Sequence, residues 1–328
     1  MTGTMRVKRR VPILAALVLT SPGLRAQQEQ NFDNVQEHVV HVRGNIYMLA
    51  GAGAGGNIAV QTGPDGILIV DTQFAPLTDK ILAAIRTFSN APIRNIVNTG
   101  YHSDHTGGNE KLRKAGSTIV GGNFTPDVDA NAAPIFAHER VLARMSAKNA
   151  LGVTVPSAAW PTDTYSGKKK DLYFNGEGVR IQHMPGAITD GDSIVYFRGS
   201  DVIATGDIFV TGSYPQIDLA AGGTINGEID AINALIDLDI PVYGQEGGTL
   251  IIPGRGRLCD LGELVDFREM LTVIRDRVQD LIKKGKTLEQ VKVARPSFDY
   301  DPEFAAPDPS YTPDMFVESI YKSLTANK

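Results

Sequence analysis

The stretch Asn98-Thr99-Gly100-Tyr101-His102-Ser103-Asp104-His105-Thr106-Gly107-Gly108-Asn109 decides the fold of this chain. It holds two imidazoles and a carboxylate close together, at His102, Asp104 and His105. Imidazoles and carboxylates are groups that bind zinc in proteins. The short apolar run Ile93–Val97 predicts a buried strand leading into the stretch, and Asn109–Ala115 predicts a helix leaving it. The pattern therefore predicts a strand, a polar loop with metal-binding groups, and a helix.

This stretch resembles the H-x-H-x-D-H loop of the metallo-β-lactamase superfamily, with Gly100 at the position of the first histidine. In that family the loop supplies ligands to two zinc ions. The resemblance implies that His102 belongs to the first metal, and that Asp104 and His105 belong to the second. The residues Thr106–Asn109 also match the family pattern.

The later family positions are only partly retained. The resemblance places Ile188 and Arg255 at two further histidine positions, and Asp207 at that of the bridging aspartate. The predicted metal ligands are His102, Asp104, His105 and Asp207. At about 3 kcal/mol per ligand, losing two histidines weakens the first metal site by about four powers of ten. We expect at most one zinc ion per chain, or none.

The order of predicted elements gives the fold class. Strand-like runs and helical spacings occur in two successive halves, which fits two sheets packed face to face with helices outside. The resemblance covers about residues 40–260 and implies the same α/β fold, an α-β-β-α sandwich of mixed sheets. Residues 150–170 are predicted to be irregular. Further strands are predicted at His38–Leu49, Asn57–Gln61, Ile67–Val70 and Thr118–Val120. Further helices are predicted at Leu77–Phe88, Ala132–Ala150 and Asp260–Lys284.

The first 26 residues are predicted to be a signal peptide, followed by a metallo-β-lactamase-like domain at 27–328. A basic start precedes the apolar run Val11–Leu19, and Leu24-Arg25-Ala26 offers a cleavage site. The run is too short to span a bilayer, which needs about 20 apolar residues. We therefore expect a periplasmic or secreted protein that is not membrane-bound after cleavage.

Charge and cysteine content narrow the possible partners. Residues 27–328 hold 27 basic and 37 acidic residues, a formal charge of −10. Such a balance argues against nucleic-acid binding through phosphate neutralisation. The single Cys259 allows no internal disulfide and is expected to be a small buried residue. A small-molecule substrate or ligand is the expected partner.

Arg255 introduces a cation where the resemblance predicts a metal ligand. Without a second metal, Asp104 and Asp207 would repel each other unless a cation lay between them. We therefore predict that the Arg255 guanidinium lies within ion-pair reach of both carboxylates. His183 is expected to be structural, and Tyr101 to pack at the rim of the pocket.

Three functional hypotheses follow. The first is a hydrolase of an ester, thioester or lactam, in which one metal activates water and Asp104 or Asp207 orients or deprotonates it. The second is a metal-free enzyme in which Arg255 stabilises an oxyanion. The third is a binding protein that retains the pocket without catalysis. We take Asp104, Asp207 and Arg255 as the candidate catalytic residues.

Overall fold

The computed structural model describes residues 32–51, 55–118, 131–148, 152–240, 247–305 and 311–326. The chain divides into two units, Met1–Asn31 and Phe32–Lys328, and only the second contains described residues. The predicted signal peptide therefore lies outside the described residues. Among the residues described, no helix has the length and apolar character needed to cross a bilayer.

The first sheet contains seven strands in the order in which they occur along the chain. Its first four strands form an antiparallel meander, and the remaining pairs are parallel. The chain turns from β3 into β4 at residues 63–66, where Gly63 pairs with Gly66. The strands are β1 (Glu37–Arg43), β2 (Ile46–Gly51), β3 (Asn57–Gly63), β4 (Gly66–Val70), β5 (Ile93–Val97), β6 (Ile135–His138) and β7 (Asp163–Tyr165).

The second sheet contains five strands in the order β12-β11-β10-β9-β8. All its pairs are antiparallel except β11 with β12, which is parallel. The strands are β8 (Lys169–Phe174), β9 (Glu177–His183), β10 (Ser193–Phe197), β11 (Val202–Ala204) and β12 (Leu250–Ile252).

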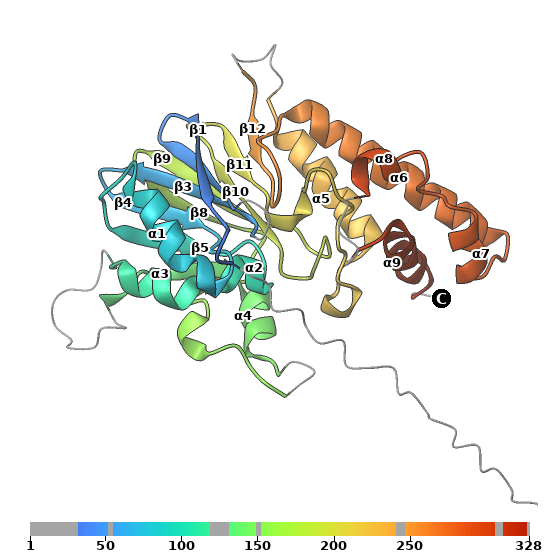
Figure 1. Ribbon diagram of the computed structural model, residues 1–328, viewed down its shortest axis with the longest axis horizontal. Helices are drawn as coiled ribbons and strands as arrows, with labels where there is room; N and C mark the ends of the chain where they lie inside the picture. Colours follow the sequence, from blue (N-terminus) through green and yellow to red (C-terminus); the bar gives the residue numbers. More distant parts are fainter. Residues whose placement is uncertain are drawn as a thin grey trace, which may run out of the picture. The chain divides into compact units, whose positions relative to one another are not determined.

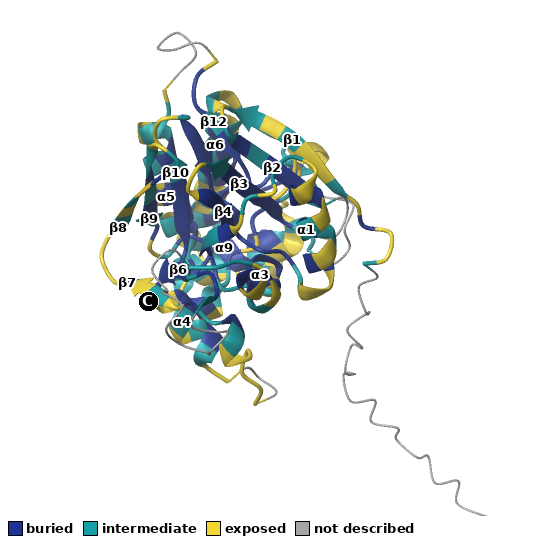
Figure 2. Ribbon diagram, turned by 90° about the vertical axis from the view of Figure 1, so that its left-hand side faces the viewer, coloured by how far each residue is buried: buried dark blue, intermediate teal, exposed yellow. Residues whose placement is uncertain are grey.

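Three apolar clusters show how the layers are stacked (Figures 1 and 2). One lies between the sheets and joins Met48 and Val97 to Val195 and Phe197. A second packs the outer face of the first sheet against α1 (Thr78–Arg86) and α3 (Asn109–Ala115). A third packs the second sheet against α5 (Ile225–Leu238), α6 (Leu261–Lys283) and α9 (Pro313–Thr325). The predicted α-β-β-α sandwich is confirmed.

The remaining helices are short and lie at the ends of strands or after α6. They are α2 (Ser103–Thr106), α4 (Glu139–Ser146), α7 (Leu288–Val293) and α8 (Asp301–Phe304). The predicted helix and strand at Asn109–Ala115 and Ile93–Val97 are confirmed to the residue.

Three local predictions were wrong. His38–Leu49 is a hairpin, because Gly44 adopts a φ of 59° and turns β1 into β2. Ala132–Ala150 is not one helix: its first part is β6, which pairs between β5 and β7. The irregular stretch 150–170 contains β7, which completes the first sheet. The strand predicted at Thr118–Val120 falls largely outside the described residues.

The fold brings four strand ends together. β4 and β5 run parallel in one sheet, and β11 and β12 run parallel in the other. In open α/β sheets, ligand sites form beyond the carboxyl ends of the strands. Asp71 follows β4, the quoted loop follows β5, Asp207 follows β11 and Arg255 follows β12.

Candidate metal centre

His105 is the most tightly held side chain of the site. It lies on α2, and its side chain is 2% exposed. Its Nδ1 lies 2.8 Å from Oδ2 of Asp71, while its Nε2 lies 3.1 Å from Oδ2 of Asp207 and 3.8 Å from Oδ2 of Asp104. Although burial lowers it, the three carboxylates together raise the pKa of His105 well above its usual value. Asp71 thus fixes the ring so that Nε2 faces Asp104 and Asp207.

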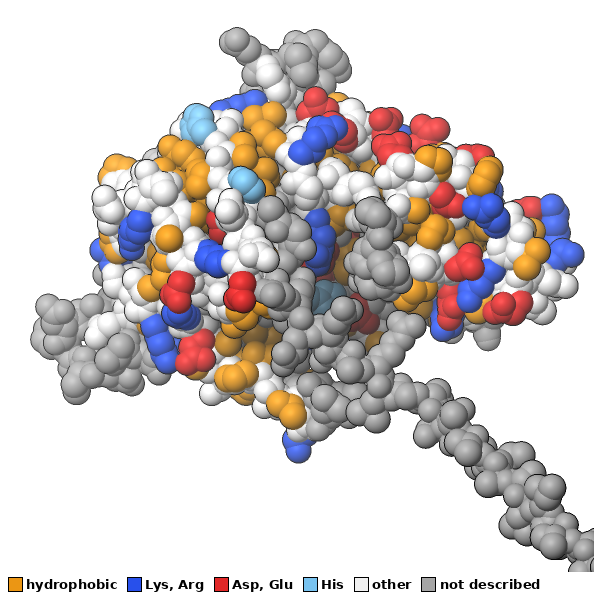
Figure 3. Space-filling model, viewed as in Figure 1, with side chains coloured by type: hydrophobic (Ala, Val, Ile, Leu, Met, Phe, Trp, Pro, Cys, Tyr) orange, Lys and Arg blue, Asp and Glu red, His pale blue; other side chains and the backbone are white. Residues whose placement is uncertain are grey.

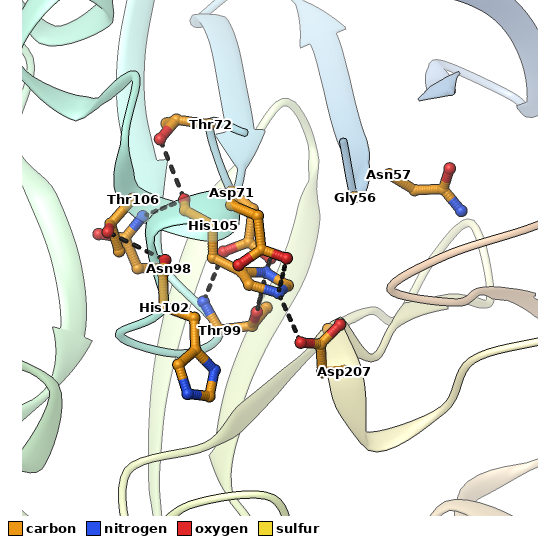
Figure 4. Close-up of polar contacts among 12 residues, drawn as sticks. Gly56, Asn57, Asp71, Thr72, Asn98, Thr99, His102, His105, Thr106 and Asp207 are labelled. Carbon is orange, nitrogen blue, oxygen red and sulfur yellow. Dashed lines mark hydrogen bonds and ion pairs between the residues drawn. The ribbon is translucent and has the colours of Figure 1, made fainter. Parts of the chain in front are cut away.

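Buried amide and hydroxyl groups hold the loop behind His105 (Figure 4). The side chains of Asn98 and Asn109 exchange hydrogen bonds of 3.0 and 2.8 Å. Thr72 donates its hydroxyl to Asn109 at 2.9 Å and to the His105 carbonyl at 3.0 Å. Because every member is buried and paired, this network keeps the loop in a single geometry.

Gly107 and Gly108 of the loop are required by close backbone contacts. A Cβ atom at Gly107 would lie 2.6 Å from the Ser103 carbonyl oxygen. A Cβ atom at Gly108 would lie 2.5 Å from the Thr72 carbonyl oxygen. The Gly-Gly pair therefore lets α2 pack directly against the end of β4.

Arg255 lies between the two carboxylates of the site, as predicted. Its guanidinium forms an ion pair with Asp104, and its Nε lies 3.6 Å from Oδ1 of Asp207. Burial raises the pKa of Asp207, but His105 and Arg255 lower it well below the usual value. Asp207 is therefore ionised, with two cationic groups beside it.

His102 does not join this group. Figure 4 shows its imidazole directed away from His105 and Asp207. Its Nε2 lies 3.3 Å from Oδ2 of Asp218, which also accepts a 2.6 Å hydrogen bond from the Tyr101 hydroxyl. Although burial lowers it, the Asp218 carboxylate raises the pKa of His102 overall. Asp218 was not predicted from the sequence. Tyr101, which was expected to pack at the rim, lies against a small apolar cluster and donates its hydroxyl to Asp218.

The other predicted positions take different places. Ile188 is 1% exposed within the apolar cluster beneath the second sheet. The backbone amide and hydroxyl of Thr189 donate to Asp192, so Asp192 holds that turn. His183 is structural: its Nε2 lies 3.0 Å from the Asp190 carbonyl oxygen.

The site opens into a cavity of about 740 Å³. Figure 3 shows basic, acidic and histidine side chains together in a hollow of this face. His102, Asp104, Asp207 and Arg255 form its polar floor. A second cavity of about 780 Å³ shares His102 and Ser103 with the first.

A protein-family model matches a large part of this sequence. The model is that of the metallo-β-lactamase superfamily, and it matches residues 45–247. The chain belongs to the metallo-β-lactamase superfamily. The matched residues include the loop, Asp71, Asp207 and most of both sheets. Helices α6 to α9 lie beyond the matched residues.

Relatives of known name are distant. The chain is 25% identical over 207 residues to the 2,4-dinitroanisole O-demethylase subunit alpha of Nocardioides sp., with 62% of this chain and 55% of the relative covered. It is 23% identical over 274 residues to the linear primary-alkylsulfatase of Pseudomonas sp., covering 70% and 47%. The chain thus spans about half the length of the curated relatives it matches.

Solved structures confirm the fold. A sec-alkylsulfatase from Pseudomonas sp. superposes with a TM-score of 0.63 at 15% identity, covering 87% of this chain and 50% of the other. A metallo-β-lactamase from Pontibacter korlensis superposes with a TM-score of 0.53 at 17% identity, covering 72% and 99%. At these identities the likeness establishes the sandwich alone.

The superfamily implies zinc, and the described residues fit one ion. One ligand atom each from Asp104, His105 and Asp207 lies within 4.8 Å of the others. Nε2 of His105 is buried and has no partner that meets hydrogen-bond geometry, as expected of an atom that awaits a ligand. Three protein ligands and an open position are typical of catalytic zinc. His102 lies outside this group and pairs with Asp218.

Proposed function

We propose that this protein is a hydrolase of an ester, thioester or lactam that uses at most one zinc ion, held by Asp104, His105 and Asp207. The observation that carries the proposal is the orientation of His105 by Asp71, which directs Nε2 toward both aspartates at the floor of the cavity. When bound, the ion would lower the pKa of water and polarise the substrate carbonyl. We also propose that the protein is exported to the periplasm or secreted.

The residues of the chain have separate roles in this proposal. Asp104 and Asp207 accept hydrogen bonds from the attacking water and orient it. Arg255, whose side chain is 43% exposed, leaves its ion pairs when an ion enters and turns toward the cavity. There it stabilises the oxyanion that forms on the carbonyl oxygen. His105 keeps its position because Asp71 holds it independently of any ion.

A metal-free enzyme is the second candidate, favoured by the ion pairs of Arg255. The Arg255 guanidinium and the His105 imidazole, whose pKa is raised, already offset the charge of the two carboxylates without a divalent ion. In that case Arg255 is the electrophile that stabilises the oxyanion.

Metal content of Arg255→Ala separates these proposals. Without the guanidinium, we expect zinc to bind at least tenfold more tightly, with close to one ion per chain by mass spectrometry of purified protein. Arg257→Ala is the matched control, since Arg257 pairs with Glu263 outside the site. Asp104→Asn should reduce zinc binding. Two tightly bound ions on the native chain would contradict the proposal.

Turnover on a panel of 4-nitrophenyl esters, thioesters and lactams separates an enzyme from a binding protein. We expect activity in native protein and its loss in Asp207→Asn. If native protein loaded with zinc, and native protein free of metal, are both inactive on every compound, the hydrolase proposal is wrong.

A further inference from the structure

The cavity above the site has two kinds of wall. Its floor is polar and charged, as described above. Its lining also includes aromatic and aliphatic side chains from two separate segments. They are Val210, Tyr214 and Ile217 from the segment after β11, and Phe304, Tyr311 and Met315 from the C-terminal region. A cavity lined by both charged and apolar side chains suits an amphipathic ligand.

The C-terminal part of this wall lies outside the superfamily match. The match ends at residue 247, whereas Phe304 ends α8 and Met315 lies on α9. The matched residues therefore supply His102, Asp104 and Asp207 of the floor, and Arg255 lies beyond them. The C-terminal segment supplies Phe304, Tyr311 and Met315 of the wall.

Buried packing fixes α9 in place. Phe316 and Ile320 are fully buried against α5 and α6, and Thr312 caps the first turn of the helix by accepting from Met315 N. The Tyr214 ring stacks on Phe316 at 4.5 Å between ring centroids. The wall is thus preorganised, which reduces the entropy lost when a ligand binds.

Polar contacts tie the two wall segments to each other. The Tyr214 hydroxyl donates to Oδ1 of Asp301 at 2.9 Å, and the Tyr311 hydroxyl donates to the Pro215 carbonyl oxygen at 3.1 Å. These bonds hold both rings in place; Tyr214 is buried, and Tyr311 is partly exposed. Met315 is 44% exposed and is the most accessible apolar side chain of the wall. Methionine adapts well to apolar ligands of varied shape.

We propose that the wall formed by α8, Tyr311 and α9 determines substrate specificity by binding an unbranched alkyl or aryl group of the substrate. This inference rests on the proposed hydrolase function. The reacting carbonyl lies over Asp104, Asp207 and Arg255, and the apolar group extends toward Met315. A cavity of about 740 Å³ is within the range of about 300–1,000 Å³ that holds drug-sized molecules.

Calorimetric binding of straight-chain carboxylates from butanoate to decanoate tests this without any turnover. The head group is constant along the series, so the slope with chain length reports the apolar wall alone. We expect affinity to increase about fourfold for each buried methylene, until the cavity is full. A flat series would overturn the proposal.

Met315→Trp should fill the apolar end, leaving butanoate binding unchanged and weakening octanoate binding at least tenfold. Met315→Asp should have the same effect on octanoate by placing a charge on the wall. Val293→Trp is the matched control, because Val293 is 83% exposed on α7 and does not line the cavity. A slope that is the same in native protein and both Met315 variants would overturn the proposal.

The outcome is distinguishable from failure of the proposed function. Chain-length-dependent binding without hydrolysis of 4-nitrophenyl octanoate would contradict the hydrolase proposal and leave the specificity wall standing. Hydrolysis at a rate independent of acyl length would support the hydrolase proposal and overturn the specificity wall.

Discussion

The two sides of the candidate site differ in how firmly their histidines are held. The His105 side chain is 2% exposed, and Asp71 holds it at 2.8 Å while a buried polar network supports its backbone. The His102 side chain is 30% exposed, and Asp218 contacts it at 3.3 Å. One histidine is fixed by the core of the fold, and the other by a loop.

This difference separates what the fold requires from what the function requires. The contacts of His105 come from strand ends and from the loop that itself enters the core, so they persist whether or not a metal binds. The contacts of His102 come from Asp218, in a surface segment just before a single 3₁₀ turn. The contacts that hold His105 in the fold are therefore separate from those that hold His102.

The largest effect is expected from rebuilding the side around His102. In the triple variant Gly100→His, Ile188→His and Arg255→His, we expect close to two zinc ions per chain. With two added ligands, the first site should bind about four powers of ten more tightly, since 1.4 kcal/mol is tenfold and each ligand adds about 3 kcal/mol. Mass spectrometry of metal content and a competitive chelator titration measure both quantities.

The backbone tolerates the first of these changes. Gly100 is not among the residues with positive φ, and a Cβ atom there would meet only Oδ1 of Asp192 at 3.5 Å. Single restorations serve as controls and should do much less. A folded triple variant that binds no more zinc than native protein would show that the substitutions do not explain the metal content.

A second prediction compares the two aspartates that hold the histidines. Asp71→Asn should lower the free energy of unfolding by about 3–5 kcal/mol, because it removes one partner of a buried pair. Asp218→Asn should lower it by about 1 kcal/mol or less, because that pair is partly exposed and asparagine still caps the turn. Urea unfolding of both variants measures the difference. Equal effects would remove the distinction between a core-held and a loop-held histidine.

Much of the structure around His105 could be predicted from the sequence. The quoted loop predicted β5 and α3, and the ion pairs of Arg255 with Asp104 and Asp207 followed from the family resemblance together with charge balance. These predictions succeeded because each rests on a local pattern or on the need to compensate buried charge.

The contacts of His102 could not be predicted in the same way. Asp218 lies 116 residues from His102 in the chain, and no motif surrounds it. β6 was missed because the alanines of 132–150 favour a helix, whereas pairing with β5 and β7 decides the structure. Tertiary contacts override local propensity at both places.

A third prediction concerns a buried glutamic acid near the site, Glu228. Glu228 on α5 is fully buried, and neither carboxyl oxygen has a hydrogen-bond partner within the described structure. Burial, then Asp192 and Asp207, raise the pKa of Glu228 well above 4.5. A raised acid pKa means that stability is greatest below the unfolded pKa and is lost as pH rises above it.

Glu228→Leu should therefore stabilise the protein by about 1–3 kcal/mol at pH 8, the typical cost of an unsatisfied buried polar group. The gain should shrink at pH 5. Asp230→Leu, on the exposed face of the same helix, is the control and should show no such pH dependence. Urea unfolding at the two pH values decides the matter, and an equal gain at both would contradict the raised pKa.

The smallest expected effect belongs to a histidine pair away from both aspartates. The rings of His138 and His183 stack at 3.6 Å between centroids and 10° between planes. Burial lowers the pKa of both, and His183 lowers that of His138 further. Because the folded pKa values lie below 6.5, the pair contributes its full stability above that pH and loses it as pH falls. Between pH 7.5 and 5.5, native protein should lose about 1 kcal/mol more stability than His183→Gln. Replacing the exposed His38 by glutamine is the control. If native protein and His183→Gln lose equal stability over this interval, the stacked pair does not contribute to the acid sensitivity of the fold.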